Sequence, residues 1–303
     1  MTGANPPLEP TAVPAPPATA VRRLAGWLHR RAPVRLGLLL AGPVGWLVIV
    51  YLGSLAILFA NALFTRDAFS GATIYQPTLD NFAELLSDPY PGITLRTILM
   101  AAAVTVTCAV IALPIGFYMA RVASPRVRGA IVVAVIVPLW ASYLIKIYSW
   151  RLILAEEGIL NSALEPLGLR GPGFGDVAVW LVFTYIWLPY MILPVFAGFE
   201  RVPGSLLEAS ADLGGRSLVT FRRILLPLVF PAIVAGSIFT FSLTLGDYIA
   251  PAQVSTTIFI GNAIYSNFGA GNFPLAAALS LVPLVTVLLY LLLARRLGAF
   301  EAL

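Results

Sequence analysis

The sequence predicts an all-α protein that crosses a membrane six times, and three observations support this prediction. Of the 303 residues, 59% are hydrophobic and 11% are charged, and the mean hydropathy is +0.90, which leaves too little polar surface to cover a soluble protein of this size. The apolar runs exceed the roughly 20 residues that a spanning helix needs, and they lack the strict alternation of barrel strands. Arginines also gather in alternate connections between the runs, as in polytopic membrane proteins.

The chain begins with a segment, residues 1–33, that we expect to be a disordered, proline-rich and basic tail. Its first 21 residues include six prolines among small side chains, and such a composition cannot bury enough apolar surface to offset the entropy of ordering. The apolar run that follows, 36–63, is too long for the core of a signal peptide and lacks a small-residue cleavage site. We therefore expect this run to be the first membrane helix.

Five further apolar runs predict the remaining membrane helices, so that the transmembrane region covers residues 34–297 and a short end follows at 298–303. The expected spans are 97–120, 129–150, 177–199, 228–250 and 274–294. Two of the connections, 79–86 and 159–167, have apolar residues at helical spacing, which predicts short helices lying on the outer membrane surface.

The distribution of basic residues predicts the orientation. If the N-terminus is cytosolic, fourteen of the nineteen Lys and Arg residues lie on the cytosolic side and five lie in or near the outer connections. Because basic residues favour the cytosolic side, we expect both termini and the loop at 201–227 to be cytosolic. The outer connections hold eight acidic residues. Two explanations are open: acidic residues are simply tolerated on the outer side of the membrane, or they weakly attract a cationic solute.

The loop at 201–227 is polar and rich in arginine, although long apolar runs flank it. Ser205 and Glu208 have the spacing of a capping box, so we expect a short helix that starts there and ends near Gly214, where glycine permits a left-handed turn. A second helix is expected from Ser217 until Pro227 breaks it. Small side chains would let another protein approach the first helix closely; they are Ala209, Ser210 and Ala211.

This loop resembles the EAA loop of bacterial ABC importer permeases, in which Glu-Ala-Ala is followed at fixed spacing by Gly, Ile and Leu-Pro. The matching positions are Glu208, Ala209, Gly214, Ile224, Leu226 and Pro227, with Ser210 in place of the second alanine. The resemblance implies a type I ABC importer permease fold with a cytosolic coupling helix, which docks on the nucleotide-binding subunit and converts its ATP-driven closure into motion of the membrane helices. The alternative is that Glu208 only caps a helix and the arginines only mark topology.

The chain is not expected to be an enzyme or to hold a cofactor or metal. Its only lysine, Lys146, lies between two isoleucines, so no phosphate-binding loop is present. Its only histidine, His29, excludes a His-Glu-x-x-His zinc site and a histidine-based triad. The resemblance implies a separate pair of ABC ATPase subunits, a second related permease and an extracytoplasmic solute-binding protein. The expected location is the lipid bilayer of the bacterial inner (plasma) membrane, and because topology explains the basic residues, nucleic acid is not an expected partner.

Two further stretches, 138–161 and 245–262, resemble permeases of the spermidine/putrescine type, which implies a polyamine or a related small cationic solute. Asp247 is the only acidic residue inside an expected span, and a carboxylate there is costly unless it faces water, a partner or a cation. Lys146 is a possible partner in a structural ion pair. Alternatively, Asp247 and Tyr248 lie on the translocation path, where the carboxylate meets an ammonium group.

Aromatic residues in the fourth expected span are further candidates for the path. Tyr185 and Trp187 lie far from either end of 177–199, so an interfacial aromatic belt does not readily explain them. Their rings can contact a cationic solute by cation–π interaction, although helix packing explains most aromatic residues of this region.

A secondary transporter or channel that works without ATP is the main alternative function. Such proteins show paired repeats of the helix set and discontinuous helices. The sequence contains no convincing repeat, and an amphipathic inner loop of 27 residues has no evident role in such a protein.

Overall fold

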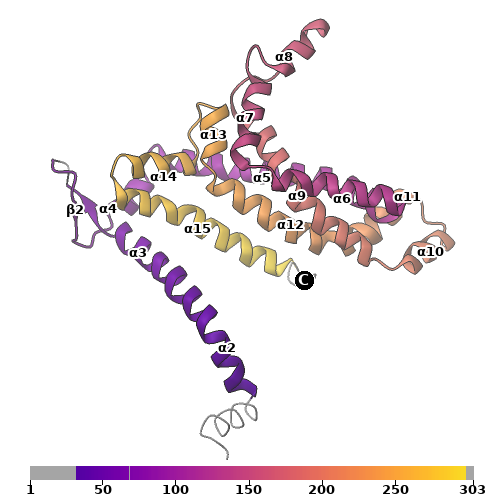
Figure 1. Cartoon of the computed structure of the whole chain (residues 1–303), viewed down its shortest axis with the longest axis horizontal. Helices are drawn as coiled ribbons and strands as arrows, with labels where there is room; N and C mark the ends of the chain where they lie inside the picture. The colour runs from indigo at the N-terminus through magenta and orange to yellow at the C-terminus, as the bar shows by residue number, and fades with distance from the viewer. Residues whose placement is uncertain (1–31, 68, 298–303) are drawn as a thin grey trace, which may run out of the picture. The chain divides into compact units, whose positions relative to one another are not determined.

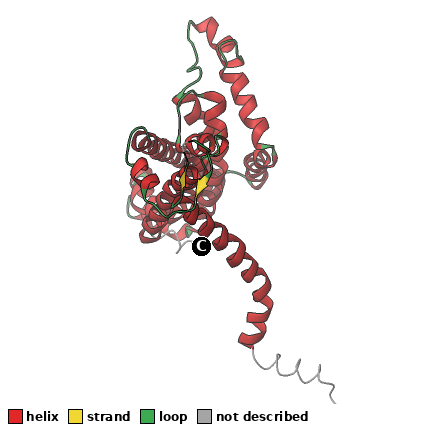
Figure 2. Cartoon of the chain, turned by 90° about the vertical axis from the view of Figure 1, so that its left-hand side faces the viewer, coloured by secondary structure: helices red, strands yellow, loops and turns green. Residues whose placement is uncertain are grey.

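The computed structural model of the chain describes residues 32–67 and 69–297 (Figure 1). The expected tail at 1–33 and the end at 298–303 therefore lie almost entirely outside the described residues. Within the described ranges helices and loops make up the chain, apart from one antiparallel pair of two-residue strands, β1 (Thr65–Arg66) and β2 (Thr73–Ile74) (Figure 2). The described residues divide between Ile57 and Leu58 into two compact units.

In the first unit, α2 (Ala32–Leu47) is followed by a π-helical segment, η1 (Val48–Leu52), and by α3 (Gly53–Ala62), which continues into the second unit. The second unit contains the two strands and the remaining helices. These are α4 (Asp80–Leu85), α5 (Tyr90–Phe117), η2 (Tyr118–Val122), α6 (Pro125–Trp140), α7 (Tyr143–Leu154), α8 (Ile159–Leu164), η3 (Glu165–Leu167), α9 (Asp176–Arg201), α10 (Gly204–Asp212), α11 (Ser217–Thr220), η4 (Phe221–Leu225), α12 (Leu226–Gly246), α13 (Ile249–Val254), α14 (Ile260–Gly269) and α15 (Phe273–Arg296).

Among the described residues, five helices are long and apolar enough to cross a membrane, and a bent pair of helices adds a sixth candidate. The five are Leu39–Ala62, Tyr90–Val122, Asp176–Arg201, Ser217–Gly246 and Phe273–Arg296. The all-α, polytopic class predicted from the sequence is therefore confirmed.

The third expected span, 129–150, is not one continuous helix. It is divided into α6 and α7, which are bent by 97° relative to each other. The backbone of Ala141 and Ser142 is extended between them, and Pro138 removes one hydrogen-bond donor from the last turn of α6. Because the apolar composition continues through the break, hydropathy alone did not reveal it.

Helix α9 lies at the centre of the second unit and packs against α5 and α12. Small residues set the distances between these helices. A Cβ atom on Gly116 of α5 would lie 3.0 Å from Val195 Cγ1, and one on Gly198 of α9 would lie 2.6 Å from the Cβ of Ala232. Such close approach is a common basis of helix association in membranes.

The two ends of this bundle differ (Figure 1). Helices α10 and α11 lie beyond one end of α9 and α12, whereas α4 and α14 lie at the opposite end. The short helices expected at 79–86 and 159–167 are present as α4 and as α8 with η3. Helices α13 and α14 were not expected, and α12 ends at Gly246 rather than at 250, because the backbone of Asp247 is extended.

Candidate functional site

Helix α10 begins one residue before Ser205, so the expected capping box is not formed. Its N-cap is Pro203, whose backbone is extended with φ −64° and ψ 135°, and no side chain caps it. The fixed φ of proline prepares the chain for a helix that starts at the next residue. Ser205 and Glu208 therefore both lie inside α10, and Glu208 is exposed.

The turn after α10 has the left-handed backbone that the sequence predicted. Gly214 has φ +73°, and its N–H donates to the carbonyl oxygen of Ala211 at 2.9 Å. The next N–H, of Gly215, donates to the carbonyl oxygen of Ser210 at 2.8 Å. These bonds satisfy carbonyls at the end of α10 that have no partner within the helix.

Ser210 stabilises the corner between α10 and α11 instead of forming its outer surface. It is buried, and its Oγ lies 2.7 Å from Oγ1 of Thr220. A Cβ atom on Gly215 would lie 2.5 Å from the same Oγ, so the corner is closely packed. The expectation that Ser210 provides room for an approaching protein is therefore wrong, whereas Ala209 and Ala211 are exposed.

Pro227 does not break the second helix of the loop. Helices α11, η4 and α12 form one continuous helix, Ser217–Gly246, with Pro227 in the first turn of α12. The π-helical turn of η4 widens the helix directly before Pro227, and such a turn accommodates an interruption of the regular hydrogen bonds. Ile224 and Leu226 are half-buried in this segment, so they anchor the loop.

The surface of the α10–α11 loop is basic with exposed apolar side chains. Leu213 is 88% exposed and Leu218 is 75% exposed, which is unusual for leucines in a polar loop. Leu213 was not among the contact residues predicted from the sequence. Its position directly before the predicted turn at Gly214 could have indicated that its side chain is exposed. Three exposed arginines lie near these leucines in the sequence, namely Arg216, Arg222 and Arg223.

At the opposite end of α12, the carboxylate of Asp247 is held by protein groups. Its Oδ1 accepts from the N–H groups of Ile249 at 2.8 Å and Ala250 at 3.2 Å, which begin α13. Its Oδ2 accepts from the hydroxyl of Tyr143 at the start of α7. In the described part of the chain Arg128 and Glu200 form an ion pair, whereas Lys146 and Asp247 do not.

The stretch 245–262 has a structural explanation. A Cβ atom on Gly261 would lie 2.8 Å from the carbonyl oxygen of Asp247, so only glycine fits there without a shift. The side-chain amide of Asn262 donates to the carbonyl oxygen of Tyr248 at 2.9 Å. Together these contacts join the start of α14 to the corner between α12 and α13.

The five residues expected on the translocation path do not gather at one point. Trp187 is 8% exposed, and its ring stacks with that of Tyr143 at a centroid distance of 6.1 Å, which connects it to Asp247. Tyr185 is instead exposed and lies beside Trp150. Tyr248 stacks on Tyr265 at 4.4 Å.

Further aromatic rings extend the cluster around Trp187. Tyr190 lies 6.0 Å from Trp187, and its other neighbour is Phe239 of α12 at 6.2 Å. The structure therefore places one carboxylate beside a row of aromatic rings, and Tyr143 joins the two. The sequence indicated Asp247 and Trp187 as candidates, but it did not predict that Tyr143 contacts Asp247, because this contact spans 104 residues.

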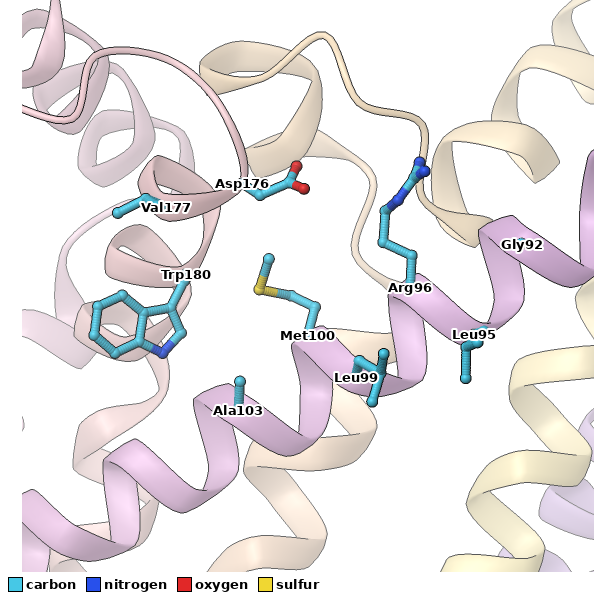
Figure 3. Close-up of a pocket in the computed structure, with 9 residues that line it drawn as sticks. All are labelled: Gly92, Leu95, Arg96, Leu99, Met100, Ala103, Asp176, Val177 and Trp180. Carbon is cyan, nitrogen blue, oxygen red and sulfur yellow. The ribbon is translucent and has the colours of Figure 1, made fainter.

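A separate groove of about 550 Å³ lies between α5 and α9 (Figure 3). Arg96 and Asp176 lie at one end of it, and its walls are apolar, with Leu99, Met100 and Trp180 among them. The groove contains none of the residues expected on the translocation path. In the described ranges, no group of three His, Cys, Asp or Glu side chains could hold a metal ion.

Comparison with known proteins places these features in a family. Residues 112–299 match the family of binding-protein-dependent transport system inner membrane components. The chain is 45% identical to the inner membrane ABC transporter permease protein YdcU of Escherichia coli (strain K12), over 95% of this chain and 97% of that protein. It is 33% identical to the spermidine/putrescine transport system permease protein PotB of Salmonella typhimurium (strain SL1344), over 82% of this chain and 89% of PotB.

The fold is also similar to a solved structure. A chain of a bacterial ABC transporter involved in the import of the acidic polysaccharide alginate superimposes with a TM-score of 0.67, over 90% of this chain and 99% of that one, at 18% sequence identity. At this identity the likeness concerns the fold alone. The family match and the two relatives go further, and they show that this chain belongs to the binding-protein-dependent transport system inner membrane components, as a multi-pass permease subunit of an ABC importer.

Proposed function

We propose that this permease imports a polyamine or a related small cationic solute, and that its α10–α11 loop is the contact through which an ATPase drives it. As a member of its family, the chain works with an ATPase pair, a second permease and a solute-binding protein. In this mechanism the ATPase pair carries out all of the ATP hydrolysis. The loop and both termini lie on the cytosolic side, where fourteen of the nineteen basic residues are then found.

The shape and surface of the loop support its role in coupling. Its corner is closed by the hydrogen bonds of Gly214 and Gly215 and by the contact between Ser210 and Thr220, so a force applied to α10 is transmitted and does not unfold the turn. Exposed apolar side chains surrounded by polar groups are typical of protein interaction sites, and Leu213 and Leu218 have this character. In this proposal they contact the ATPase together with Glu208 and Ala209.

The cluster around Asp247 supports a cationic solute. An ammonium group is attracted both by a carboxylate and by the faces of aromatic rings, and the structure has Asp247, Tyr143 and Trp187 side by side. PotB, a relative at 33% identity, is a spermidine/putrescine permease. The hydrogen bonds of Asp247 to Tyr143 and to the start of α13 equally support a structural role, so transport measurements on an Asp247 variant must separate the two roles.

The observation that carries the coupling proposal is the left-handed turn at Gly214, and replacing Gly214 with Pro tests it. Proline cannot adopt φ +73° and has no N–H for the bond to Ala211. Gly168 provides a matched control, because it has φ +68° and its N–H donates to Glu165 at 2.9 Å, but it lies after α8 and η3. Both variants are expressed with the partner subunits and reconstituted in lipid.

The measurements are co-purification of the ATPase and its stimulation by the solute-binding protein loaded with putrescine or spermidine. Gly214→Pro should abolish the stimulation at normal expression, whereas Gly168→Pro should leave ATPase co-purification unchanged. If stimulation survives in Gly214→Pro, the loop is not the contact. Uptake of the solute without any ATPase would favour a secondary transporter instead, and stimulation by neither polyamine would refute the proposed solute class.

A further inference from the structure

Arg121 connects two membrane helices directly beside the α10–α11 loop, which we call the coupling loop after its proposed role. It lies in η2 at the end of α5, and its Nη2 donates to the carbonyl oxygen of Phe199 at 2.7 Å and to that of Val202. Both acceptors are at the C-terminal end of α9, where carbonyls lack the regular helical partner four residues on; the Phe199 carbonyl also accepts from the N–H of Val202 at 3.4 Å. The positive charge also lies favourably at the negative end of the helix dipole.

These two carbonyls lie where the chain passes from α9 to α10. Val202 is followed by Pro203, the N-cap of α10, so the guanidinium holds the chain at the point where it leaves α9 for the coupling loop. Arg121 is half-buried and reaches over 78 residues of sequence to Phe199. The two helices therefore meet at the base of the loop and not merely somewhere along their length.

A second arginine strengthens the same junction. Nη1 of Arg128, in α6, lies 3.1 Å from Oε1 of Glu200, and its Nη2 donates to the carbonyl oxygen of Ala120 at 3.3 Å. The side chains of this ion pair are 37% and 43% exposed, so the pair contributes little to stability by itself. Its geometric effect is to connect α6, η2 and α9 at one place.

Close packing surrounds these polar contacts. Phe117 of α5 contacts Phe199 edge to face at a centroid distance of 5.6 Å, and Gly116 lies against the backbone of Phe196. On the other side of α9, Gly198 lies against Ala232 of α12. Since α12 continues directly from α11, both ends of the coupling loop enter one packed junction.

We propose that Arg121 is a positioning residue for transport: it joins the start of the coupling helix to α5, so that α5, α9 and α10 move as one body when the ATPase closes. This inference rests on the proposed role of the α10–α11 loop. Arg121 touches no solute in this proposal and acts only by fixing α10. Without its guanidinium, movement of α10 is absorbed locally and reaches α5 only in part.

Three variants of the full complex, reconstituted in lipid, test the inference. Arg121→Gln removes the charge and the double contact, and Arg121→Lys keeps the charge and donors that reach a carbonyl. Arg126→Gln is the control, because Arg126 is exposed in the first turn of α6 and forms no side-chain hydrogen bond or ion pair with the described residues. Spermidine uptake and ATPase activity are measured against the concentration of the loaded solute-binding protein.

In Arg121→Gln, the maximal uptake per ATP hydrolysed should fall about tenfold, because losing hydrogen bonds to a charged group shifts the equilibrium between the joined and the separated junction by about this factor. The concentration of binding protein at half-maximal stimulation and the amount of co-purified ATPase should not change. Arg121→Lys should recover most of the uptake, and Arg126→Gln should behave like the unmodified protein. Equal uptake per ATP in Arg121→Gln and Arg126→Gln would overturn the inference.

A distance measurement keeps the inference testable if Arg121→Gln assembles poorly. Spin labels at Ala211 in α10 and at the exposed Val110 in α5 report this junction directly, in a chain whose single cysteine Cys108 is replaced by serine. In the unmodified complex the distance should stay the same without nucleotide and with trapped ATP. A distance that changes between these states by more than its spread would show that the junction does not move as one body.

The outcomes also separate this inference from the proposed function. If Gly214→Pro abolishes stimulation but Arg121→Gln has no effect on uptake per ATP, the loop couples and Arg121 is not needed. If Gly214→Pro has no effect, the loop itself is not the contact, and the role of Arg121 fails with it.

Discussion

The contact between α9 and α12 gives a sharp prediction, because it depends on a single missing methyl group. Replacing Gly198 with Ala would place a Cβ atom 2.6 Å from the Cβ of Ala232 and 3.3 Å from Cγ1 of Val229. Carbon atoms pack at roughly 3.5–4.0 Å, so the two helices would have to separate by about 1 Å at this point. We expect the substitution to destabilise the bundle.

The magnitude follows from two opposing effects. Overpacking of this kind costs about 1–3 kcal/mol, whereas replacing a glycine inside a helix with alanine gains roughly 0.5–1 kcal/mol. Gly129 in α6 isolates the second effect, because a Cβ atom there meets nothing within 4 Å. The difference in free energy of unfolding between Gly198→Ala and Gly129→Ala should therefore equal the overpacking cost alone, about 1–3 kcal/mol.

Titration of the purified chain with sodium dodecyl sulfate in mixed micelles, followed by tryptophan fluorescence, measures these free energies. Adding Ala232→Gly to Gly198→Ala removes the methyl group that clashes with the new Cβ atom. The double variant should therefore be more stable than the sum of the stability changes of the two single variants predicts. The reasoning is refuted if Gly198→Ala is as stable as Gly129→Ala, or if the two substitutions at the contact are additive.

Two further predictions concern the candidate sites. Asp247→Asn should weaken spermidine uptake roughly tenfold, because the charge is lost from a charge-assisted contact, while membrane insertion stays normal and the amide oxygen still accepts from Ile249; unchanged transport kinetics would exclude Asp247 from the path. Ser210→Ala removes the 2.7 Å contact with Thr220 and should cost the loop about 1 kcal/mol. Faster hydrogen exchange in α10 and α11 would reveal this loss, and unchanged exchange would show that the contact does not stabilise the corner.

The features that could be predicted well are those determined by the residues of one short segment. Long apolar runs indicated the membrane helices, and a glycine after a short polar helix indicated the left-handed turn at Gly214. The start of α10 was misplaced because Pro203 and the capping pattern at Ser205 compete, and local reasoning cannot decide between them. The proline was decisive because its backbone is fixed before any side-chain contact forms.

The features that escaped prediction depend on contacts between distant residues. Asp247 meets Tyr143 across 104 residues, and Arg121 meets the end of α9 across 78 and 81 residues. One sequence contains no signal for such pairs. The bend after Trp140 was hidden for another reason, because an apolar helix and an apolar break have the same hydropathy.

Because of that bend, the two helices of the third span contact different parts of the bundle. Helix α6 is tied to α9 by Arg128 and Glu200, whereas α7 is tied to the corner around α13, through Tyr143 to Asp247 and through Arg151 to Gln253 at 2.6 Å. Because the regular backbone hydrogen bonds are interrupted at Ala141 and Ser142, rotation there disrupts little structure. The third span is thus built as a hinge between two helices: α6 is attached to the end of the bundle that carries the α10–α11 loop, and α7 is attached to the opposite end, at the corner between α12 and α13.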